Sequence, residues 1–442
     1  MKKTLAILLM VSMGLWSVAC GDTGSSTEAG TSQEDTIEVS EREDAVTLNV
    51  TSTFAGNDSN AQNYIDAYEA WEATTGNQVS DSSGTADELF KTRVNNDFEV
   101  GAEPDVLFYF NGSDADSFIS AGKVVSIEEI QSVYPDYATN MNMEFVAASP
   151  VDGVQYAIPV NGYWEGLFVN ETVLQAAGVE VPGADYTWEQ FLLDCETIAD
   201  AGYIPIAAAL GNVPHYWFEF AIYNHLSAET HATVPTAIDD VNGLAWIDGV
   251  ADIKGLYEQG YFPANTLSAT DDETVQMFID GKAAFLIDGS WKTGHIEDYA
   301  ENIEDFTVTY VPGQGERAAT DMIGGLSSGW YITRKAWEDP DKQAAAVDFV
   351  SYMTSDEVVS VFASYTLTAL ANPVSSTDVE LSSLALDAIA MTDGATGVSG
   401  AVQDSMPTEA RAQIFADIPY MVTGEKEITT GVQDVLDLMK DE

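Results

Sequence analysis

The stretch Glu103-Pro104-Asp105-Val106-Leu107-Phe108-Tyr109-Phe110 decides the fold class. Its second half is a continuous apolar run that follows a proline and an acid. Such a run is typical of a strand that is buried on both faces of a parallel sheet. Parallel strands need a long crossover connection, so the residues on either side of this stretch must supply helices.

The residues before this strand predict the connection that a parallel sheet requires. Residues 46–50 (Val-Thr-Leu-Asn-Val) alternate apolar and polar side chains, as a half-buried strand does. Tyr64, Tyr68 and Trp71 then recur at helical spacing, and another helix is predicted around Phe90. The order of strand, helix, helix and strand predicts a parallel sheet with crossover connections.

The same alternation continues along the chain. Thr187-Trp188-Glu189-Gln190 has the pattern of a capping box and predicts a helix that starts there. Cys195 falls within that helix and is interpreted as a small core residue. Strands are predicted over residues 283–287 and 306–311, and a helix is predicted after Asp339-Pro340. The pattern predicts an α/β protein, and the length of 442 residues favours two lobes.

The composition is dominated by acid. The chain has 72 Asp and Glu against 16 Lys and Arg, which gives a formal net charge of −56. A negative field of this size repels phosphate backbones and anionic lipids, so the sequence disfavours nucleic-acid binding and attachment through a basic patch. We interpret the acidity as a solvated surface, because attraction of a cationic solute would require charge inside the binding site. Two cysteines are too few for a disulfide scaffold or a four-thiolate zinc site.

The first residues predict export and lipid anchoring. Lys2 and Lys3 precede an apolar run over residues 4–16, which is too short to span a bilayer. Ser17-Val18-Ala19-Cys20 resembles the bacterial lipoprotein signal, in which residues 1–19 are removed and the cysteine is lipidated; relatives more often have Leu where Ser17 stands. Residues 20–45 are rich in Gly, Ser, Thr and acids and predict a flexible tether. The alternative is an ordinary signal peptide that leaves Cys20 without a role.

Motifs for catalysis and for cofactors are incomplete. Gly325-Leu326-Ser327-Ser328-Gly329 matches the G-x-S-x-G nucleophile elbow, but there the catalytic histidine follows the serine, and the last histidine here is His295. Residues 313–318 match a dinucleotide loop only loosely. The four histidines lack helical ligand spacing, and Asp114 and Asp116 lack the rest of a calcium loop. The sequence therefore predicts no enzyme, no metal and no cofactor.

Short segments spread over the chain recur in the order of one known family. Asp152-Gly153-Val154-Gln155-Tyr156-Ala157-Ile158-Pro159 is similar to its DGKxYGIP, and Gly289-Ser290-Trp291 is similar to the end of its FxxGkaAmxxxGsW. The other matching segments are 103–106, 121–125, 167–170, 177–179, 187–191, 278–285, 324–325 and 344–353. Together they resemble the extracellular solute-binding proteins of bacterial ABC importers, in particular the carbohydrate-binding branch that includes maltose-binding protein.

The resemblance implies a two-lobed periplasmic-binding-protein-like fold (type II), in which a hinge joins two α/β lobes and the ligand lies in the cleft between them. The implied lobes are residues 46–151 with 320–367, and residues 152–319 with 368–442. The implied hinge crossings lie near Asp152, Asp321 and Thr368. Open α/β sheets bind ligands beyond the carboxyl ends of their strands, which agrees with a cleft between lobes.

A neutral sugar offers apolar C–H faces and a ring of hydroxyls, so its site needs aromatic platforms and fixed hydrogen-bonding partners. Trp291 aligns with the family's stacking tryptophan, and Tyr216 and Trp217 fall where the resemblance places cleft aromatics. Of Tyr163 and Trp164, one is expected to face the ligand and the other to pack. The further candidates are Tyr109, Asn111, Asp58 and Trp330, with helix capping as the alternative for Asp58 and core packing as the alternative for Trp330.

These features predict a receptor that captures a carbohydrate, an oligosaccharide, and delivers it to an ABC permease. We expect a monomer that a lipid on Cys20 holds on the extracytoplasmic face of the cell membrane. The alternatives are another solute, such as a polyamine, glycerol phosphate or a peptide, and a secreted glycan-degrading lipoprotein enzyme. The small number of basic residues disfavours a phosphorylated solute.

Overall fold

The apolar run at residues 106–110 forms β3 (Val106–Phe110), an inner strand of a four-stranded sheet with the order β2-β1-β3-β9. The computed structural model describes residues 45–315, 317–372 and 381–440. β1 (Thr47–Thr51) pairs in parallel with β3 and with β2 (Gln78–Asp81), as predicted. β9 (Ser328–Ile332), which comes from much later in the chain, pairs with β3 in the antiparallel direction.

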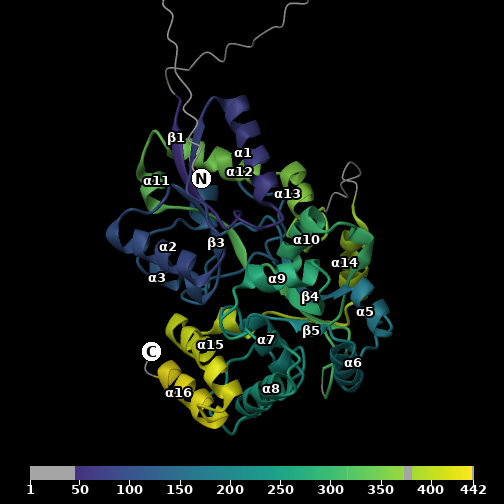
Figure 1. Cartoon of the computed structure of the whole chain (residues 1–442). Helices are drawn as coiled ribbons and strands as arrows, with labels where there is room; N and C mark the ends of the chain where they lie inside the picture. Colours follow the sequence, from purple (N-terminus) through teal and green to yellow (C-terminus); the bar gives the residue numbers. More distant parts are fainter. Residues whose placement is uncertain (1–44, 316, 373–380, 441–442) are drawn as a thin grey trace, which may run out of the picture. The chain divides into compact units, whose positions relative to one another are not determined.

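Helices cover both faces of this first sheet (Figure 1). α1 (Ala61–Thr75), α12 (Gln343–Met353) and α13 (Asp356–Phe362) pack on the face that carries Phe108. α2 (Glu88–Val100) and α3 (Asp116–Ser120) pack on the face that carries Tyr109. The side chains alternate in this way because successive residues of a strand point to opposite faces. The remaining short elements are η1 (Ser113–Ala115), α4 (Ile127–Val133) and α11 (Arg334–Glu338).

The second sheet is six-stranded and is built around β4 (Tyr163–Asn170). β6 (Ala283–Gly289) runs antiparallel along one edge of β4, and β5 (Ile204–Ala207) pairs in parallel with β6. β8 (Asp321–Gly325) and β7 (Phe306–Thr309) follow one another along the other edge of β4. β10 (Gly397–Ser399) pairs with β8.

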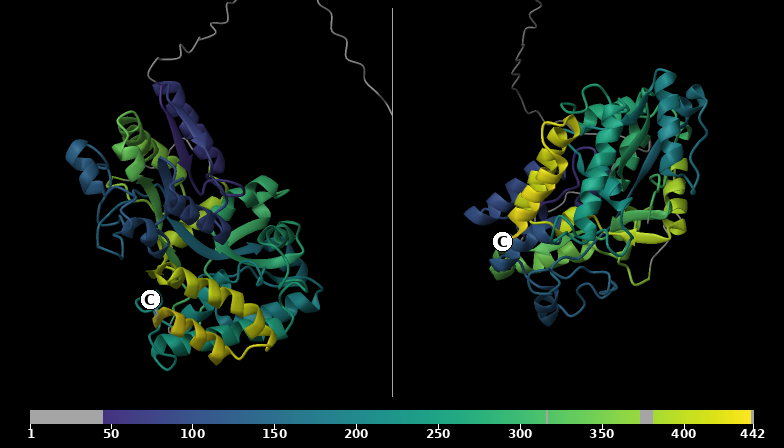
Figure 2. Two further views of the ribbon diagram at one scale, coloured as in Figure 1. Left: turned by 90° about the vertical axis from the view of Figure 1, so that its left-hand side faces the viewer. Right: turned by 90° about the horizontal axis from the view of Figure 1, so that it is seen from below.

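Two groups of helices enclose the second sheet. Leu167 and Val169 of β4 face one hydrophobic cluster, and Trp164 and Phe168 face another. The first cluster takes in α5 (Glu171–Ala177), α6 (Trp188–Asp200), α7 (His215–Tyr223), α8 (Val241–Glu258), α15 (Thr408–Thr423) and α16 (Ile428–Lys440). The second takes in α9 (Asp271–Ile279), α10 (Thr293–Tyr299) and α14 (Ser383–Gly394). Figure 2 shows α15 and α16, in yellow, beside α8.

The chain crosses between the sheets at loops, and the two-lobed α/β fold is confirmed. Ile158 still bridges to Trp330 in the first sheet, whereas β4 starts in the second sheet at Tyr163. The return crossing lies at residues 326–327, between β8 and β9, and Leu370 still bridges to the first lobe. The expected crossings were near Asp152, Asp321 and Thr368. The observed ones lie slightly later because main-chain pairing continues past each expected point, and the exact lobe boundaries stay a prediction.

Most predicted elements are present with small shifts at their ends. Thr187 caps α6 as predicted, since its hydroxyl accepts a hydrogen bond from the Gln190 backbone at 3.2 Å. The capping box is wrong in its second half, because the Gln190 side chain donates to Asp194 at 2.8 Å and not back to Thr187. The helix predicted after Asp339-Pro340 begins at Gln343 as α12. Cys195 is buried in α6, as predicted.

The predicted signal peptide, Cys20 and nearly all of the predicted tether lie outside the described residues. Within the part of the chain that the structure describes, no helix combines the length and the apolar character needed to cross a membrane.

Candidate ligand-binding site

Trp291 lies two residues after the end of β6, in the short helix η2 (Ser290–Lys292). Its half-buried ring covers the Cα of Gly289 so closely that a Cβ at that position would lie 2.2 Å from the indole. The backbone of Gly289, with φ of −104°, is open to any residue. The requirement for glycine here is therefore steric, and any larger residue would displace the Trp291 ring.

Two tyrosines flank this indole. Tyr163, the first residue of β4, and Tyr216, in the first turn of α7, each place the ring centroid 6.1 Å from that of Trp291. Aromatic rings at this separation are in favourable contact. Three predicted ligand-binding residues, from elements far apart in the sequence, thus form one group, which we call the aromatic cluster (Tyr163, Tyr216 and Trp291).

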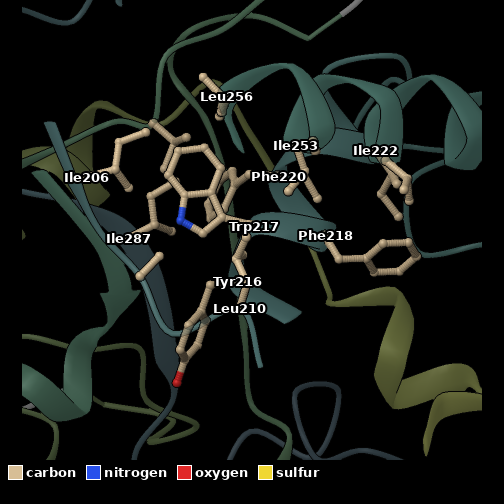
Figure 3. Packing of buried hydrophobic residues seen from close by; sticks show 14 of the residues in the cluster. Ile206, Leu210, Tyr216, Trp217, Phe218, Phe220, Ile222, Ile253, Leu256 and Ile287 are labelled. Carbon is tan, nitrogen blue, oxygen red and sulfur yellow. The ribbon is translucent and has the colours of Figure 1, made fainter. Parts of the chain in front are cut away.

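Trp217, the residue after Tyr216, packs in the core of the second lobe. Successive side chains on a helix diverge by about 100°, so Tyr216 and Trp217 cannot share one direction. The Trp217 ring is buried between Phe191 and Phe262, with centroid distances of 6.2 and 5.5 Å. Figure 3 shows its indole among apolar side chains such as Ile206, whereas the Tyr216 ring points away from them. Of this pair, the structure brings only Tyr216 to the aromatic cluster.

Of Tyr163 and Trp164, at the start of β4, one also joins the aromatic cluster and the other packs in the core. Tyr163 and Trp164 point to opposite faces of the sheet because side chains alternate along a strand. Trp164 is fully buried beside Phe168, and its indole N–H donates to the Tyr365 carbonyl at 3.0 Å. Tyr163 therefore takes the position beside Trp291, and Trp164 is the residue that packs.

Two of the other candidates lie in the core of the first lobe. Trp330 is fully buried and packs on Phe108 and Phe349, with centroid distances of 5.2 and 5.6 Å. Tyr109 is buried against Phe118, and its hydroxyl has no hydrogen-bond partner in the part of the chain that the structure describes. The core alternative for Trp330 accounts for its position, and neither side chain joins the aromatic cluster.

The two polar candidates are held by local hydrogen bonds. Asn111 joins β3 to the turn between β8 and β9, since its backbone N–H donates to the Ser327 carbonyl at 2.7 Å and its amide to the Leu326 carbonyl at 3.2 Å. Asp58 accepts from the Asn60 backbone at 2.8 Å immediately before α1. Burial raises the pKa of Asp58 to about 7, although this hydrogen bond and the charge of Lys292 act against the shift.

A contact between the lobes passes through the main chain of Trp291. The Ser59 hydroxyl, in the loop between β1 and α1, donates to the Trp291 carbonyl at 2.8 Å and accepts from the Gly294 backbone at 3.0 Å. Sequence reasoning missed Ser59, because a small polar residue in a loop carries no distinguishing signal. Asp58 is the residue before Ser59, so this contact places Asp58 on the side of the first lobe that meets the main chain of Trp291.

Two buried carboxylates stand beside the aromatic cluster. Glu165 of β4 lies opposite Gly289 in the strand register and is 2% exposed, and Asp288 is 0% exposed. Asp288 Oδ1 accepts from the Gly289 backbone at 2.7 Å, whereas Asp288 Oδ2 and Glu165 Oε2 have no hydrogen-bond partner among the described residues. Burial raises the pKa of Asp288 to about 7. Burial, with the charges of nearby acids, raises the pKa of Glu165 well above its usual range.

Sequence reasoning missed both carboxylates, although a signal was present. Glu165 interrupts the otherwise largely apolar run of β4, and Asp288 stands at the end of the buried strand β6. Charged residues are almost never fully buried unless they are paired or functional. An acid inside a predicted buried strand would therefore have been a candidate in its own right.

A second contact between the lobes is made by charges. Asp114 of η1 pairs with Arg411 of α15 at 2.5 Å and with Lys91 of α2 at 3.0 Å. Arg411 is 0% exposed. Burial alone would raise the pKa of Asp114, but these two cations outweigh it and hold the pKa below its usual value. The acid that the sequence presents as part of an incomplete calcium loop is therefore half of an ion pair between the lobes.

Replacing Asp404 with asparagine is expected to raise the free energy of unfolding above that of the wild type, by a gap that grows as the pH rises from about 4 to about 7. Asp404 lies in η4 (Val402–Ser405), and burial raises its pKa to about 7; Asp114 and Glu219 add to the shift, and Lys91 and Arg411 oppose it. A carboxyl whose pKa is higher in the folded state keeps its proton there at a pH where it has lost it in the unfolded state. The free energy of unfolding is therefore highest below pH 4 and falls as the pH approaches 7. Asparagine does not titrate, so the gap in free energy of unfolding should widen by up to about 4 kcal/mol, since a difference of one pKa unit corresponds to about 1.4 kcal/mol.

Thermal unfolding of both proteins at pH 4.5, 6 and 7.5 measures this gap. Asp200→Asn, at the exposed end of α6, is the matched control that removes one charge from the surface. A gap that stays constant over the series, or that is largest at low pH, would contradict the assignment of Asp404 as an acid that titrates near neutrality in the folded protein.

Two α/β lobes that touch beside a cluster of aromatic rings have the architecture of hinged binding proteins for small solutes. Within the described residues, no group of three or more His, Cys, Asp or Glu side chains could hold a metal ion. A sequence profile of the bacterial extracellular solute-binding proteins matches residues 63–386. The chain belongs to this family.

Individual relatives agree on the fold. The chain is 22% identical over 216 residues to the sn-glycerol-3-phosphate-binding periplasmic protein of Rhizobium meliloti (strain 1021), and the match spans only 48% of each chain. It is similar in structure to a chitin oligosaccharide binding protein, with a TM-score of 0.76, 19% identity and coverage of 90% of this chain and 99% of that one. It is also similar to the maltose/maltodextrin-binding domain of Bdellovibrio bacteriovorus bound to maltotriose, with a TM-score of 0.69, 17% identity and coverage of 89% and 99%.

Proposed function

We propose that this protein is the substrate-binding lipoprotein of a bacterial ABC importer and that it captures a carbohydrate, an oligosaccharide, between its lobes. The observation that carries the proposal is the aromatic cluster, in which a half-buried indole is flanked by two tyrosines and stands beside buried carboxylates. A sugar ring offers apolar C–H faces to such rings and hydroxyl donors to carboxylates. The similar proteins that bind chitin oligosaccharides and maltotriose support the same substrate class.

In this proposal Trp291 is the platform on which a sugar ring stacks, and Tyr163 and Tyr216 form its sides. Asp58 is the proposed hydroxyl partner from the first lobe, because the adjacent Ser59 contacts the Trp291 carbonyl. Closure of the lobes over the ligand would bring these groups together, and each closed lobe would offer a surface to the permease. We propose no catalytic step.

Glycerol phosphate is the solute that the Rhizobium relative binds by name, and it is the second candidate. A phosphate group in this site would lie near Glu165 and Asp288, and each of these carboxyl groups would repel it when ionised. The charge of the site therefore favours a sugar without phosphate. Binding of a polyamine or a peptide, and degradation of a glycan, are distinguished from sugar binding by experiment.

The test is a thermal-shift screen of the chain from residue 46 onward against saccharides, sn-glycerol 3-phosphate, polyamines and peptides. A ligand at 100 times its Kd adds about 2.7 kcal/mol to the free energy of unfolding, which is a shift of a few degrees. A shift with one class of saccharide supports the proposal. A shift with only glycerol phosphate, amines or peptides would keep the family and overturn the substrate class, and recovery of shortened saccharides would indicate an enzyme.

Replacing Cys20 with alanine is expected to release the protein from the membrane, because the proposed lipid is attached to this thiol and one or more acyl chains supply the membrane affinity. The measurement is the share of the protein in the membrane pellet and in the soluble fraction of cells that express each form. Ser17→Ala, next to the same processing site, is the matched control and should stay in the membrane. A Cys20→Ala chain that remains in the pellet would exclude the lipid anchor.

A further inference from the structure

Glu165 is a buried carboxylate without a counterion. The side chain is 2% exposed, its Oε2 atom has no hydrogen-bond partner, and no ion pair within the described residues includes it. The charged groups that act on it are Glu219, Asp288 and Asp404, all of them acids. Burial of an unpaired carboxylate is costly, so such a group in a native protein calls for a partner that binds it.

Two of the three acids whose charges act on Glu165 have hydrogen-bond partners within the described chain, and the third lies near cations. Asp288 accepts a backbone N–H and lies near the charge of Lys292, which itself pairs with an aspartate at 2.6 Å. Glu219 accepts two backbone N–H groups, at 2.9 and 3.0 Å. Asp404 is half-buried, and the charges of Lys91 and Arg411 act on it. Glu165 differs from all three because the charged groups that act on it within the described residues include no cation and it accepts no backbone N–H there.

The position of Glu165 places its carboxylate at the aromatic cluster. It lies directly opposite Gly289 in the pairing of β4 with β6, and the Trp291 ring covers Gly289. Tyr163 stands two positions earlier on β4 and therefore on the same face of the sheet. The charge of Glu165 also acts on the hydroxyls of both tyrosines, which places it within electrostatic range of the whole cluster.

Aromatic faces next to an unpaired carboxylate recognise a particular chemistry. The faces of Trp and Tyr attract cations, and most strongly where water is excluded. A buried carboxylate binds an ammonium group better than a hydroxyl, because hydrogen bonds between two charged groups are the stronger ones. We propose that the solute is an amino sugar with a free, protonated amine, and that Glu165 and the aromatic cluster bind this ammonium group. The inference rests on the proposed function and narrows its substrate class.

Titration calorimetry of the full chain in mild detergent at pH 6.5 tests the proposed amine recognition with sugars that differ only in the substituent at C2 of each ring. Cellotetraose, fully deacetylated chitotetraose and chitotetraose share one β-1,4 backbone and carry a hydroxyl, an ammonium and an acetamide group at C2. Glucose with glucosamine and galactose with galactosamine extend the comparison to single rings. We expect the ammonium form of the bound backbone to bind at least tenfold more tightly than its hydroxyl form.

Glu165→Gln is expected to remove this preference, so that the ammonium and hydroxyl forms bind within about threefold of each other. Glutamine keeps the shape of the side chain but cannot ionise, so the variant should remain folded and lose the negative charge with which an ammonium group would pair. Glu196→Gln, on the exposed side of α6, is the matched control that makes the same replacement of an acid by its amide and should keep the preference. This control distinguishes an effect of the Glu165 carboxylate from an effect of the overall negative charge of the protein.

The comparison of amino and neutral sugars in the wild-type protein is enough to overturn the amino-sugar inference without overturning the carbohydrate proposal. A neutral sugar that binds as tightly as its amino form, or tighter, would exclude amine recognition and leave the carbohydrate proposal standing. A preference that survives Glu165→Gln would exclude Glu165 as its source. If no saccharide binds while spermidine or sn-glycerol 3-phosphate does, the carbohydrate proposal itself fails, and the amino-sugar inference fails with it.

Discussion

Replacing Trp330 with alanine is expected to lower the free energy of unfolding by about 3–5 kcal/mol, the range for removing a large aromatic side chain from a packed core. The indole is fully buried, and its ring lies 5.2 Å from Phe108, 5.6 Å from Phe349 and 6.4 Å from Phe54. These neighbours come from three separate elements, so they cannot collapse together into the space that alanine would leave. Urea unfolding followed by circular dichroism measures the loss.

Trp330→Phe provides the matched comparison. The indole N–H of Trp330 is buried and has no hydrogen-bond partner within the described residues, so phenylalanine removes an unsatisfied donor while it keeps most of the ring contacts. Its cost should be less than half that of alanine. Affinity for the solute should stay within about threefold in both variants, since the side chain lies in the core of the first lobe. If Trp330→Ala kept the stability of the wild type and lost the solute, Trp330 would be a ligand-binding residue and not a core residue.

The sequence was sufficient for the elements whose signal is local. The apolar run of β3 and the alternation in β1 depend only on neighbouring residues, and both strands pair in parallel as predicted. The lobe crossings could not be placed with the same accuracy. Ile158 continues to pair with Trp330 after the segment that suggested a crossing at Asp152, and this pairing depends on a strand far along the chain.

The candidate site was predictable in part for the same reason. Alternation along β4 requires Tyr163 and Trp164 to face opposite sides of the sheet, but it does not say which side faces the ligand. That choice depends on the element that covers each face, and here Trp291, from the end of β6, stands beside Tyr163. The unpaired state of Glu165 was likewise beyond sequence reasoning, since it depends on which neighbours reach the carboxylate.

Replacing Trp291 with alanine is expected to weaken binding of the solute by about 30-fold or more, which corresponds to about 2 kcal/mol, and to change the free energy of unfolding by less than about 1 kcal/mol. The indole is the middle ring of the aromatic cluster and is only half-buried, so its removal takes away the proposed platform without opening a cavity in the core. Titration calorimetry with the saccharide identified in the screen measures the affinity, and urea unfolding measures the stability. Affinity equal to that of the wild type would remove Trp291 from the site.

Gly289→Ala tests the same platform without changing any aromatic residue. An alanine Cβ at this position would lie 2.2 Å from the indole, a distance that no packed structure accepts, so the ring must move away from the sheet. The backbone itself accommodates alanine, because its φ of −104° is in the extended region. If Trp291 binds the solute from its present position, Gly289→Ala should weaken binding nearly as much as Trp291→Ala. Full affinity in Gly289→Ala combined with a loss in Trp291→Ala would mean that the indole binds the ligand from another orientation.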